Sequence, residues 1–373
     1  MADLRPLSAL RYAEPLEPVL APPYDVLTEA QVAELRARSA HNVVHLTRPG
    51  KDYSGAARLL REWIASGVLV EESSPSLYVH EVSFDGHSRR DLVGALRLQP
   101  YEEGAVLPHE RTHRGPREDR LALMRATGAS LEPLWFLAEG LRELLASAPL
   151  GHELSFEFAG ERHALRAVPQ GDWTESVHRA LAEQPVLIAD GHHRYETTLA
   201  YSQEVGGGDD AASRFTLALL SDLADPGLVV LPTHRLLKSG VAVTGGEPVG
   251  SLPELLRALR GRVAAGTYRG GAFQLLPLEG EVPMLELHRQ VIDNILGKRS
   301  PEEYLEYTRD PEEAVRRVDE GAAAAAFFLD TPDLAAVLRV ARSGETLPQK
   351  TTYFYPKPPS GMLFHLLDPR RTL

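Results

Sequence analysis

The sequence predicts an α+β protein in which mixed or antiparallel sheets carry flanking helices. Apolar runs of strand length alternate with amphipathic stretches of helix length, and turn dipeptides typical of antiparallel hairpins separate two pairs of strands. No segment recurs with a period of about 20–50 residues, which excludes solenoids and propellers. With 373 residues the chain exceeds the ~250–300 residues at which one hydrophobic core stops growing, so we expect two regions, residues 1–170 and 171–373.

Local signals predict the helices and hairpins of the first region. Thr28 and Gln31 form a capping box that opens a helix running toward Arg38. The other elements expected here are a strand at 43–46, a helix at 54–66 closed by Gly67, and hairpins that turn at Asp85-Gly86 and at Ala159-Gly160.

The second region is organised around a strand, a glycine turn and a helix. Residues 186–189 form a short apolar run, which is typical of a strand buried on both faces. Asp190–Arg194 follows at once and leads into a helical stretch that ends near Val205. The other elements expected are strands at 215–220, 228–231, 322–329 and 351–355, and helices at 252–259, at 287–296 and from a Thr331-Pro332 cap to Ala341.

Charge and composition exclude several classes of function. Forty basic and 52 acidic side chains give a formal net charge of −12, which repels nucleic-acid backbones. The chain has no cysteine, so disulfides, thiolate catalysis and cysteine-ligated metal centres are excluded. No apolar run has the length of a membrane span, and the N-terminus lacks the apolar stretch of a secretory signal. We therefore expect a soluble cytoplasmic protein that binds neither nucleic acid nor a membrane.

Residues His109 to His113 match the H-E-x-x-H pattern of zinc peptidases. In that pattern two histidines share one helical face, and the glutamate between them polarises a metal-bound water. Here Pro108 precedes the pattern and Gly115-Pro116 follows it, and neither flank supplies the apolar stripe that would bury such a helix. A metallopeptidase is therefore a minor alternative, and we favour a polar loop that serves another purpose.

The polar stretch 101–118 should be an extended loop, because it contains two prolines and a Gly-Pro pair. Loops of this length in a compact chain are usually functional or disordered. Cations gather in and just after it: Arg111, His113, Arg114, Arg117 and Arg120. In an acidic protein they would attract a phosphorylated ligand, unless Glu110, Glu118 and Asp119 neutralise them as on an ordinary solvated face.

The turn Asp190–Arg194 is the main candidate for an anion site. A strand-to-helix turn leaves the first amide hydrogens of the helix unpaired, and the helix dipole there also favours an anion. Gly191 permits close approach of a ligand to the backbone, and Arg194 can supply a bidentate fork. A phosphate site with His192 and His193 beside it follows from this arrangement. The alternative is that Asp190 only caps the helix and both histidines lie on the surface.

Two further segments place a hydroxyl group beside a cation. They are Thr233-His234-Arg235, after an expected strand, and Lys350-Thr351, near the end of the chain. Such patterns recur by chance, so we treat these five residues as secondary candidates.

Five motifs in this order resemble the domain-of-unknown-function-1015 family. They are Pro22-Pro23-Tyr24-Asp25-Val26, His109-Glu110-Arg111-Thr112, the run Ala189–Glu196, Pro232-Thr233-His234-Arg235 and the run Leu347–Lys357. The resemblance spans nearly the whole chain. Thr351 stands where the family usually has a serine, and His113 is not part of the family pattern.

The turn Asp190–Arg194 is also distantly similar to the turn that holds nucleotide phosphates in the ParB/sulfiredoxin-like superfamily, which includes free-serine kinases. This resemblance implies a ParB/sulfiredoxin-like nucleotide-binding core with large additions. It implies that Gly191, His192, His193 and Arg194 contact phosphate groups and that Asp190 lies near the metal or the acceptor hydroxyl. The superfamily's short upstream acidic motif has no clear counterpart at the expected distance in this sequence.

These residues and resemblances together predict a nucleotide-dependent phosphotransferase that acts on a small hydroxylated metabolite, with serine as the first substrate to test. Phosphoryl transfer needs amide hydrogens, an arginine, Mg²⁺ and a carboxylate that orients the acceptor hydroxyl. We expect Mg²⁺ near Asp190, ATP or ADP as the phosphoryl donor, and a homodimer as an open option. A phosphatase acting on the phosphorylated metabolite would use nearly the same groups. A non-catalytic nucleotide-binding regulator is the alternative from another class.

Three carboxylates are candidates for acid–base work. Asp190 should stay ionised beside the anion site, which suits a metal ligand or a group that orients the acceptor. Glu110 lies on the polar loop and could close onto the acceptor when substrate binds, so we predict that it is the base. Asp25 is the third candidate and is also placed to cap a turn. We further predict that the loop folds over the turn, so that His109 and Arg111 join the phosphate site.

Overall fold

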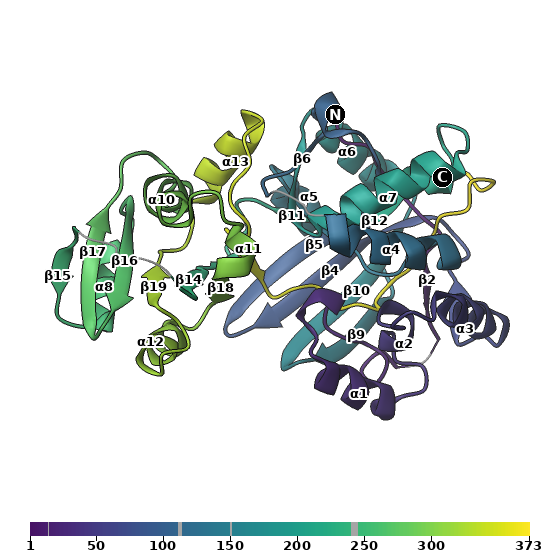
Figure 1. Ribbon diagram of the computed structural model, residues 1–373. Coiled ribbons are helices and arrows are strands. Elements are labelled where there is room, and N and C mark those ends of the chain that lie inside the picture. The colour runs from purple at the N-terminus through teal and green to yellow at the C-terminus, as the bar shows by residue number, and fades with distance from the viewer. Residues whose placement is uncertain (14, 111–113, 150, 240–244) are drawn as a thin grey trace. The chain divides into compact units, whose positions relative to one another are not determined.

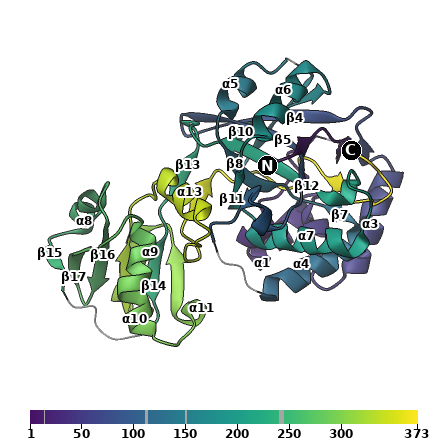
Figure 2. The same cartoon turned by 90° about the horizontal axis from the view of Figure 1, so that it is seen from above.

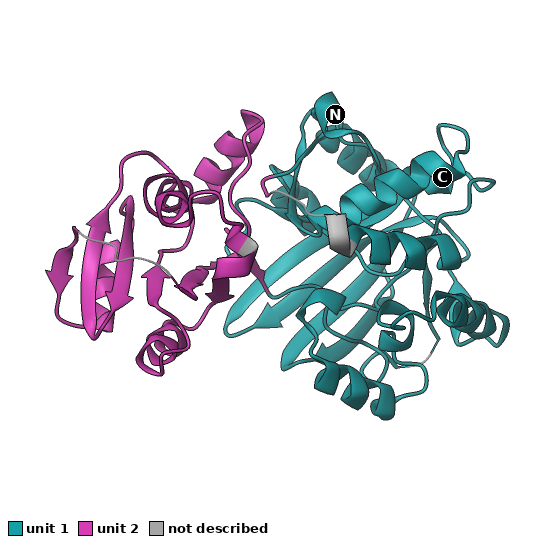
Figure 3. Cartoon of the chain, in the orientation of Figure 1, with its two compact units in different colours: residues 1–108, 112–228, 356–373 teal, residues 109–111, 229–355 magenta. Residues whose placement is uncertain are grey.

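The computed structural model describes residues 1–13, 15–110, 114–149, 151–239 and 245–373, and these form two compact units (Figure 3). Unit 1 comprises Met1–Pro108, Thr112–Leu228 and Pro356–Leu373, and unit 2 comprises His109–Arg111 and Val229–Tyr355. The expected boundary at residue 170 falls between β10 (Glu161–Pro169) and β11 (Val186–Asp190), two strands of one sheet. The chain therefore does not divide there.

A large mixed sheet forms the centre of unit 1 (Figure 1). Its strand order is β6-β11-β8-β12-β5-β4-β10-β9, with β1 beside β5. The pairs β11/β6 and β12/β8 are parallel and the other pairs are antiparallel, which confirms the predicted mixed sheet with flanking helices. Their bounds are β1 (Leu4–Arg5), β4 (Ser76–Phe84), β5 (His87–Arg97), β6 (Val106–Leu107), β8 (Leu134–Ala138), β9 (Glu153–Phe158) and β12 (Phe215–Asp222).

Both predicted hairpins are confirmed. Asp85 and Gly86 join β4 to β5 with φ values of 44° and 78°, and Ala159 and Gly160 join β9 to β10 with 52° and 85°. Two successive residues with positive φ match the right-handed twist of the strands that they connect.

Helices pack around the sheet of unit 1, and the three that begin at Glu29, Tyr53 and His192 correspond to predicted helices. The Thr28–Gln31 capping box opens α1, as expected. The helices are α1 (Glu29–Arg38), α2 (Val44–Thr47), α3 (Tyr53–Ala65), α4 (Arg114–Thr127), α5 (Leu141–Ala146), α6 (Asp172–Leu181) and α7 (His192–Val205), with short 3₁₀ turns at Tyr24–Val26, Tyr101–Glu103 and Ala212–Arg214. Two short strand pairs, β2 (Leu10–Tyr12) with β3 (Leu69–Glu71) and β7 (Ala129–Ser130) with β21 (His365–Leu366), complete the unit.

Two local predictions in unit 1 are wrong. Residues 43–46 were expected to form a strand but contribute to α2, because the Asn42 side chain accepts the Val44 amide hydrogen at 3.0 Å and starts a helical turn. The stretch 101–118 was expected to be a loop throughout, but α4 begins at Arg114. Pro116 lies in the first turn of α4, where no intrahelical hydrogen bond is lost. The helix then packs against α3 and α7, and α4 and α7 lie side by side in Figure 2.

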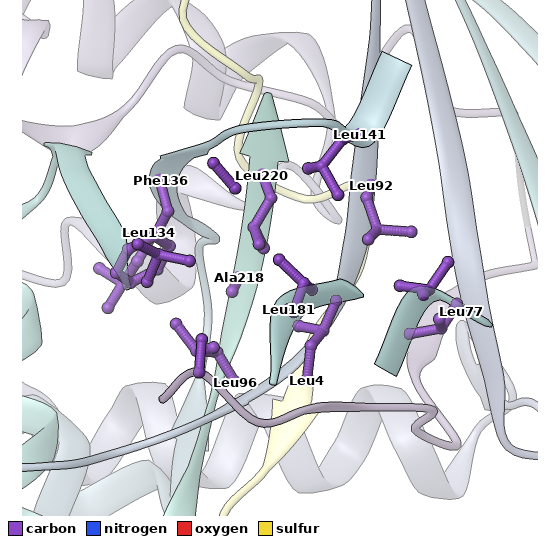
Figure 4. Packing of buried hydrophobic residues seen from close by; sticks show 14 of the residues in the cluster. Leu4, Leu77, Leu92, Leu96, Leu134, Phe136, Leu141, Leu181, Ala218 and Leu220 are labelled. Carbon is purple, nitrogen blue, oxygen red and sulfur yellow. The ribbon is translucent and has the colours of Figure 1, made fainter. Parts of the chain in front are cut away.

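The main hydrophobic core lies between the large sheet and helices α5, α6 and α7. Leu77, Leu92, Phe136 and Leu220 project from the strands and pack with Leu141 and Leu181 (Figure 4). Tyr195 anchors the first turn of α7 in the same core. This packing fixes the start of α7 relative to the end of β11.

A buried polar network, which the sequence did not predict, also lies within the large sheet. Asp91 is fully buried and accepts hydrogen bonds from Arg89 Nε at 2.8 Å and from Ser221 Oγ at 2.5 Å. Its other oxygen lies 3.1 Å from His80 Nδ1, and His80 Nε2 lies 3.0 Å from His163 Nδ1. The Arg89 guanidinium also stacks over Trp135. These residues satisfy one another on adjacent strands.

Unit 2 contains an antiparallel sheet in the order β15-β17-β16-β19-β14-β18 and a separate pair, β13 with β20. Leu236, Leu255 and Phe328 are among its core residues. Its elements are β13 (Val229–Leu231), β14 (His234–Leu237), β15 (Glu247–Val249), α8 (Leu252–Leu259), β16 (Ala264–Arg269), β17 (Ala272–Pro277), α9 (Pro283–Leu287), a π-helical turn (His288–Ile292), α10 (Asp293–Leu296), α11 (Pro301–Tyr304), β18 (Leu305–Thr308), α12 (Pro311–Asp319), β19 (Ala325–Phe328), α13 (Leu334–Arg342) and β20 (Tyr353–Tyr355).

The start of α13 differs from the prediction. Asp333, rather than Thr331-Pro332, caps the helix, because its carboxylate accepts the Ala335 amide hydrogen at 3.0 Å. None of the described helices is both long enough and apolar enough to cross a membrane.

Three buried histidines should make the folded protein less stable in acid. Burial lowers the pKa of His234 to about 4, of His288 to about 3 and of His365 to about 4. Because these values lie below the ~6.5 of an unfolded chain, the stabilisation is complete above pH ~6.5 and is lost as pH falls toward 4. We expect the melting temperature, measured by circular dichroism, to fall between pH 7 and pH 5.

A variant at His234 tests the cause of that sensitivity. His234→Asn keeps an acceptor for the Leu329 amide, which lies 3.4 Å from His234 Nδ1, but cannot titrate. Its melting temperature should therefore fall less between pH 7 and pH 5 than that of the wild type. Equal melting temperatures of the wild type at the two pH values would contradict the assignment.

Candidate functional site

The strand–turn–helix predicted at Asp190–Arg194 is confirmed. β11 ends at Asp190, Gly191 has φ +99°, and α7 begins at His192. A Cβ on Gly191 would lie 2.9 Å from Leu134 Cδ2 and 3.2 Å from Arg194 Nη2, so both the backbone angle and the space favour glycine here. His192 is buried at the first position of the helix, and His193 is half-buried beside it.

The Asp190 carboxylate lies between two cations. Arg194 Nη2 donates to Asp190 Oδ2 at 2.9 Å, and Lys357 Nζ donates to Asp190 Oδ1 at 2.6 Å. Lys357 Nζ also lies 3.4 Å from Asp25 Oδ2. Unit 1 therefore brings together three segments that are distant in the sequence: Pro22–Val26, the turn after β11, and the segment after β20.

A second acidic residue, Glu132, holds the other side of Arg194. Arg194 Nη1 donates to the Pro133 carbonyl at 2.9 Å and lies 3.7 Å from Glu132 Oε2. Glu132 Oε1 accepts from the Tyr24 amide at 3.0 Å and from Ser360 Oγ at 2.5 Å. Burial opposes the charge of Arg194, but Glu132, Asp190 and Asp25 raise its pKa above the usual range, so the guanidinium stays charged.

Tyr24 links this site to α4. The Arg120 guanidinium carbon lies 4.3 Å from the centre of the Tyr24 ring, and Arg48 Nη1 donates to the Tyr24 carbonyl at 2.8 Å. Burial raises the pKa of the Tyr24 hydroxyl, which therefore stays neutral. We name the set Tyr24, Asp25, Glu132, Asp190, Gly191, Arg194 and Lys357 the carboxylate–cation site.

The cations predicted to form one field along residues 111–120 have individual partners where they are described. Arg117 Nη1 lies 2.9 Å from Glu196 Oε2, and Arg120 Nη2 lies 2.6 Å from Asp119 Oδ2. Arg111 and His113 lie outside the described residues, and the side chain of Arg114 is not described.

Unit 2 contains a second cluster, built from the motif at His109-Glu110 and the loop before β20. The buried His109 Nε2 lies 2.9 Å from Thr352 Oγ1, and Glu110 Oε1 accepts the Thr351 amide hydrogen at 3.0 Å. A bridge between Glu110 and Leu347 adds backbone pairing. The Glu110 side chain is therefore anchored within unit 2, whereas the sequence predicted that it would lie on a mobile loop.

Arg235 holds the same loop from the other side. Its Nη2 donates to the carbonyls of Gln349 and Lys350 at 3.1 and 2.9 Å, and Nη1 donates to the Thr233 carbonyl. Burial lowers the pKa of Arg235 to about 10. Lys350 has φ +57°, a strained backbone angle for a residue other than glycine.

The secondary candidates are therefore partly brought together. Thr233, Arg235, Lys350 and Thr351 lie in this cluster. His234 belongs with the hydrophobic core, because side chains alternate along β14, and its ring lies 5.3 Å from that of Phe328.

The helical geometry of a zinc peptidase is not present at His109-Glu110, because these residues lie outside any helix. Among the described residues, no group of three or more histidine, aspartate or glutamate side chains is arranged to hold a metal ion. His109 and Glu110 belong to unit 2 and the Asp190–Arg194 turn to unit 1, so a pocket shared by the two motifs stays a prediction.

Lys357 and Glu132 are site residues that the sequence did not single out. Lys357 lies in a segment that resembles the family motif, so a signal for it was present. Glu132 stands in no motif, and only its partners in the folded chain reveal it.

Several solved structures are similar to this chain. A free serine kinase in complex with AMP is 17% identical, with a TM-score of 0.40, over 67% of this chain and 84% of that chain. A conserved hypothetical protein from Pyrococcus furiosus is 18% identical, with a TM-score of 0.40, over 70% and 93%. SbnI with a C-terminal truncation, from Staphylococcus aureus, is 11% identical, with a TM-score of 0.38, over 72% and 85%.

No curated protein matches the sequence. The model of one family, described as a protein of unknown function (DUF1015), matches residues 4–317. This match covers most of the chain and includes four of the five motifs, while the run Leu347–Lys357 lies beyond it. The chain is a member of the DUF1015 family.

Proposed function

We propose that this protein is a nucleotide-dependent phosphotransferase that acts on a small hydroxylated metabolite. The observation that carries the proposal is the carboxylate–cation site, where Asp25, Asp190, Arg194 and Lys357 meet at the N-terminus of α7. The first amides of this fourteen-residue helix have no intrahelical partner, and its dipole favours an anion. A structural ion pair on its own would require neither four charged side chains from separate segments in one place nor a glycine turn beside them.

The chemistry of phosphoryl transfer matches these groups. The reaction depends mainly on positioning and on neutralising charge on the phosphates. In this proposal Gly191, His192, His193 and Arg194 bind the phosphates, and Lys357 leaves the carboxylates to donate to a phosphate oxygen. Once Lys357 has moved, the Asp190 carboxylate orients the acceptor hydroxyl. His109 and Arg111 are proposed as further phosphate ligands, and Glu110 as the base that takes the acceptor's proton.

Two of these residues, Asp25 and Asp190, carry carboxylates of the kind that binds Mg²⁺. The ion usually takes one or two protein carboxylates and completes its coordination with nucleotide phosphates and water. Asp25 and Asp190 share one ammonium group, so a cation between them is favourable. We propose that these two carboxylates hold Mg²⁺, which supplies further neutralisation of phosphate charge when bound. ATP or ADP is the proposed donor, and serine is the first acceptor to test, because the turn resembles that of free-serine kinases.

Replacing Arg194 with alanine tests this function. Because a charge-assisted hydrogen bond contributes about 1.5–3 kcal/mol, we expect nucleotide to bind about 10–100-fold more weakly. The measurement is isothermal titration of ATP and ADP in the presence of Mg²⁺. Lys357→Met, which keeps the apolar stem, should weaken binding in the same direction.

Arg125→Ala is the matched control, because Arg125 is an exposed cation on α4 that pairs only with the exposed Glu204 among the described contacts. Its nucleotide affinity should equal that of the wild type. If Arg194→Ala is folded and binds nucleotide normally, the phosphate site is misplaced.

A further inference from the structure

A cavity of about 50 Å³ lies in unit 1 directly beside the carboxylate–cation site. Arg194 and Glu132, two members of that site, form part of its wall. Leu123 and Met124 of α4 and Leu131 supply apolar surface. An apolar cavity with a few polar groups is the usual form of a small-molecule site.

The hydroxyl of Thr47 is the feature that points to a ligand. Thr47 lines the cavity, is 1% exposed, and its Oγ1 has no hydrogen-bond partner among the described residues. Its carbonyl, by contrast, accepts from Arg120 Nη1 at 2.7 Å. A buried hydroxyl without a partner is unfavourable, and in native proteins another protein group, a water molecule or a ligand usually satisfies it.

The size of the cavity limits what it can hold. A single buried water needs about 10–15 Å³ on the same scale, so the cavity has room for about three to five non-hydrogen atoms. That is too small for a nucleobase or a sugar. It suits the short carbon chain of a small metabolite, with the rest of that molecule outside.

Two guanidinium groups at the wall of the cavity could receive an anionic group. Among the described lining residues, Arg120 and Arg194 carry guanidinium groups and Glu132 carries the one carboxylate. Arg120 pairs with Asp119 and Arg194 with Asp190, so a carboxylate next to the short chain would bind by taking over one of these guanidinium contacts.

We infer that this cavity is the acceptor subsite, and that the acceptor is a short-chain hydroxy acid or hydroxy amino acid, one polar group of which pairs with the Thr47 hydroxyl. The inference rests on the proposed function, because it assigns the second substrate of the same reaction. Leu123, Met124 and Leu131 exclude longer or branched chains by contact. Arg194 then serves both substrates, with one edge toward the nucleotide phosphates and the other toward the cavity.

Two variants test the subsite, with L-serine, L-threonine and D-glycerate as probes and ethanolamine, which lacks the carboxylate, as the comparison. Thr47→Val removes the hydroxyl at constant shape, and Met124→Trp fills the cavity. Titration calorimetry without nucleotide should show that at least one of the acids binds the wild type. Its dissociation constant should rise at least tenfold in both variants, and ethanolamine should bind more weakly than that acid.

The outcomes separate this inference from the proposed function. Thr47→Val should melt no lower than the wild type, because it loses an unpaired hydroxyl, and both variants should keep the wild-type affinity for ATP. An acid that binds the wild type and is lost in the variants supports the subsite even if no nucleotide binds. The subsite would be overturned if both variants bound the acids as tightly as the wild type, or if the wild type bound none of the acids at millimolar concentration. If nucleotide still bound in either case, the proposed function would stand.

Discussion

Glu110→Gln should lower the turnover of phosphoryl transfer about 10²–10⁴-fold and leave nucleotide affinity unchanged, because a general base typically contributes that factor. Glutamine keeps an oxygen that can accept the Thr351 amide hydrogen, which Glu110 accepts at 3.0 Å. The loop before β20 should therefore stay in place while the negative charge is lost. The measurement is the initial rate with saturating nucleotide and acceptor, together with titration of the nucleotide.

Glu118→Gln is the matched control, because Glu118 is an exposed glutamate on α4. Its rate should equal that of the wild type. Full turnover in Glu110→Gln would show that another group takes the proton, and Asp25 would then be the next residue to test.

Replacing Asp91 with alanine should lower the free energy of unfolding by about 3–5 kcal/mol, because a buried cation then loses its counter-charge. Arg89 and His80 are each 0–1% exposed and both contact the Asp91 carboxylate. Burial alone would raise the pKa of Asp91, but Arg89 and His80 lower it to about 2. The stabilisation is therefore complete above about pH 4, near the pKa of an unfolded aspartate, and is lost as pH falls toward 2. Urea unfolding at pH 7 measures the loss.

Glu204→Gln provides the comparison for that experiment. It breaks an exposed ion pair with Arg125, which water screens, and should leave the unfolding midpoint unchanged. If Asp91→Ala unfolds at the same urea concentration as the wild type, the buried network does not stabilise unit 1.

Elements with strong local signals were predictable from the sequence. The Thr28–Gln31 cap, the Asp85-Gly86 and Ala159-Gly160 turns and the Asp190–Arg194 turn depend on residues within a few positions of one another. Helix α4 was missed because a Gly-Pro pair near its start hides a helix that is held by packing against α3 and α7. The short helix α2 was missed because its β-branched residues favour a strand, while the Asn42 side chain decides the turn.

For the candidate site, the sequence predicted the residues that lie in motifs but not which of them come into contact. Asp25, Asp190 and Arg194 were named, but their meeting with Lys357 joins positions separated by up to 332 residues, and no local pattern encodes that contact. The two-unit division was missed for the same reason. The large sheet takes strands from both expected regions, and the end of the chain returns to unit 1.

The proposed phosphotransferase activity can be tested by titrating the wild-type protein with ATP, ADP and CTP in the presence of Mg²⁺ and then analysing L-serine and the other acids by mass spectrometry. The proposed function predicts saturable binding of ATP or ADP and a product that is heavier than one of the acids by one phosphoryl group. Absence of nucleotide binding would contradict the phosphate site. Tight nucleotide binding without phosphorylation of any hydroxylated metabolite would indicate a non-catalytic nucleotide-binding regulator and contradict the proposed activity.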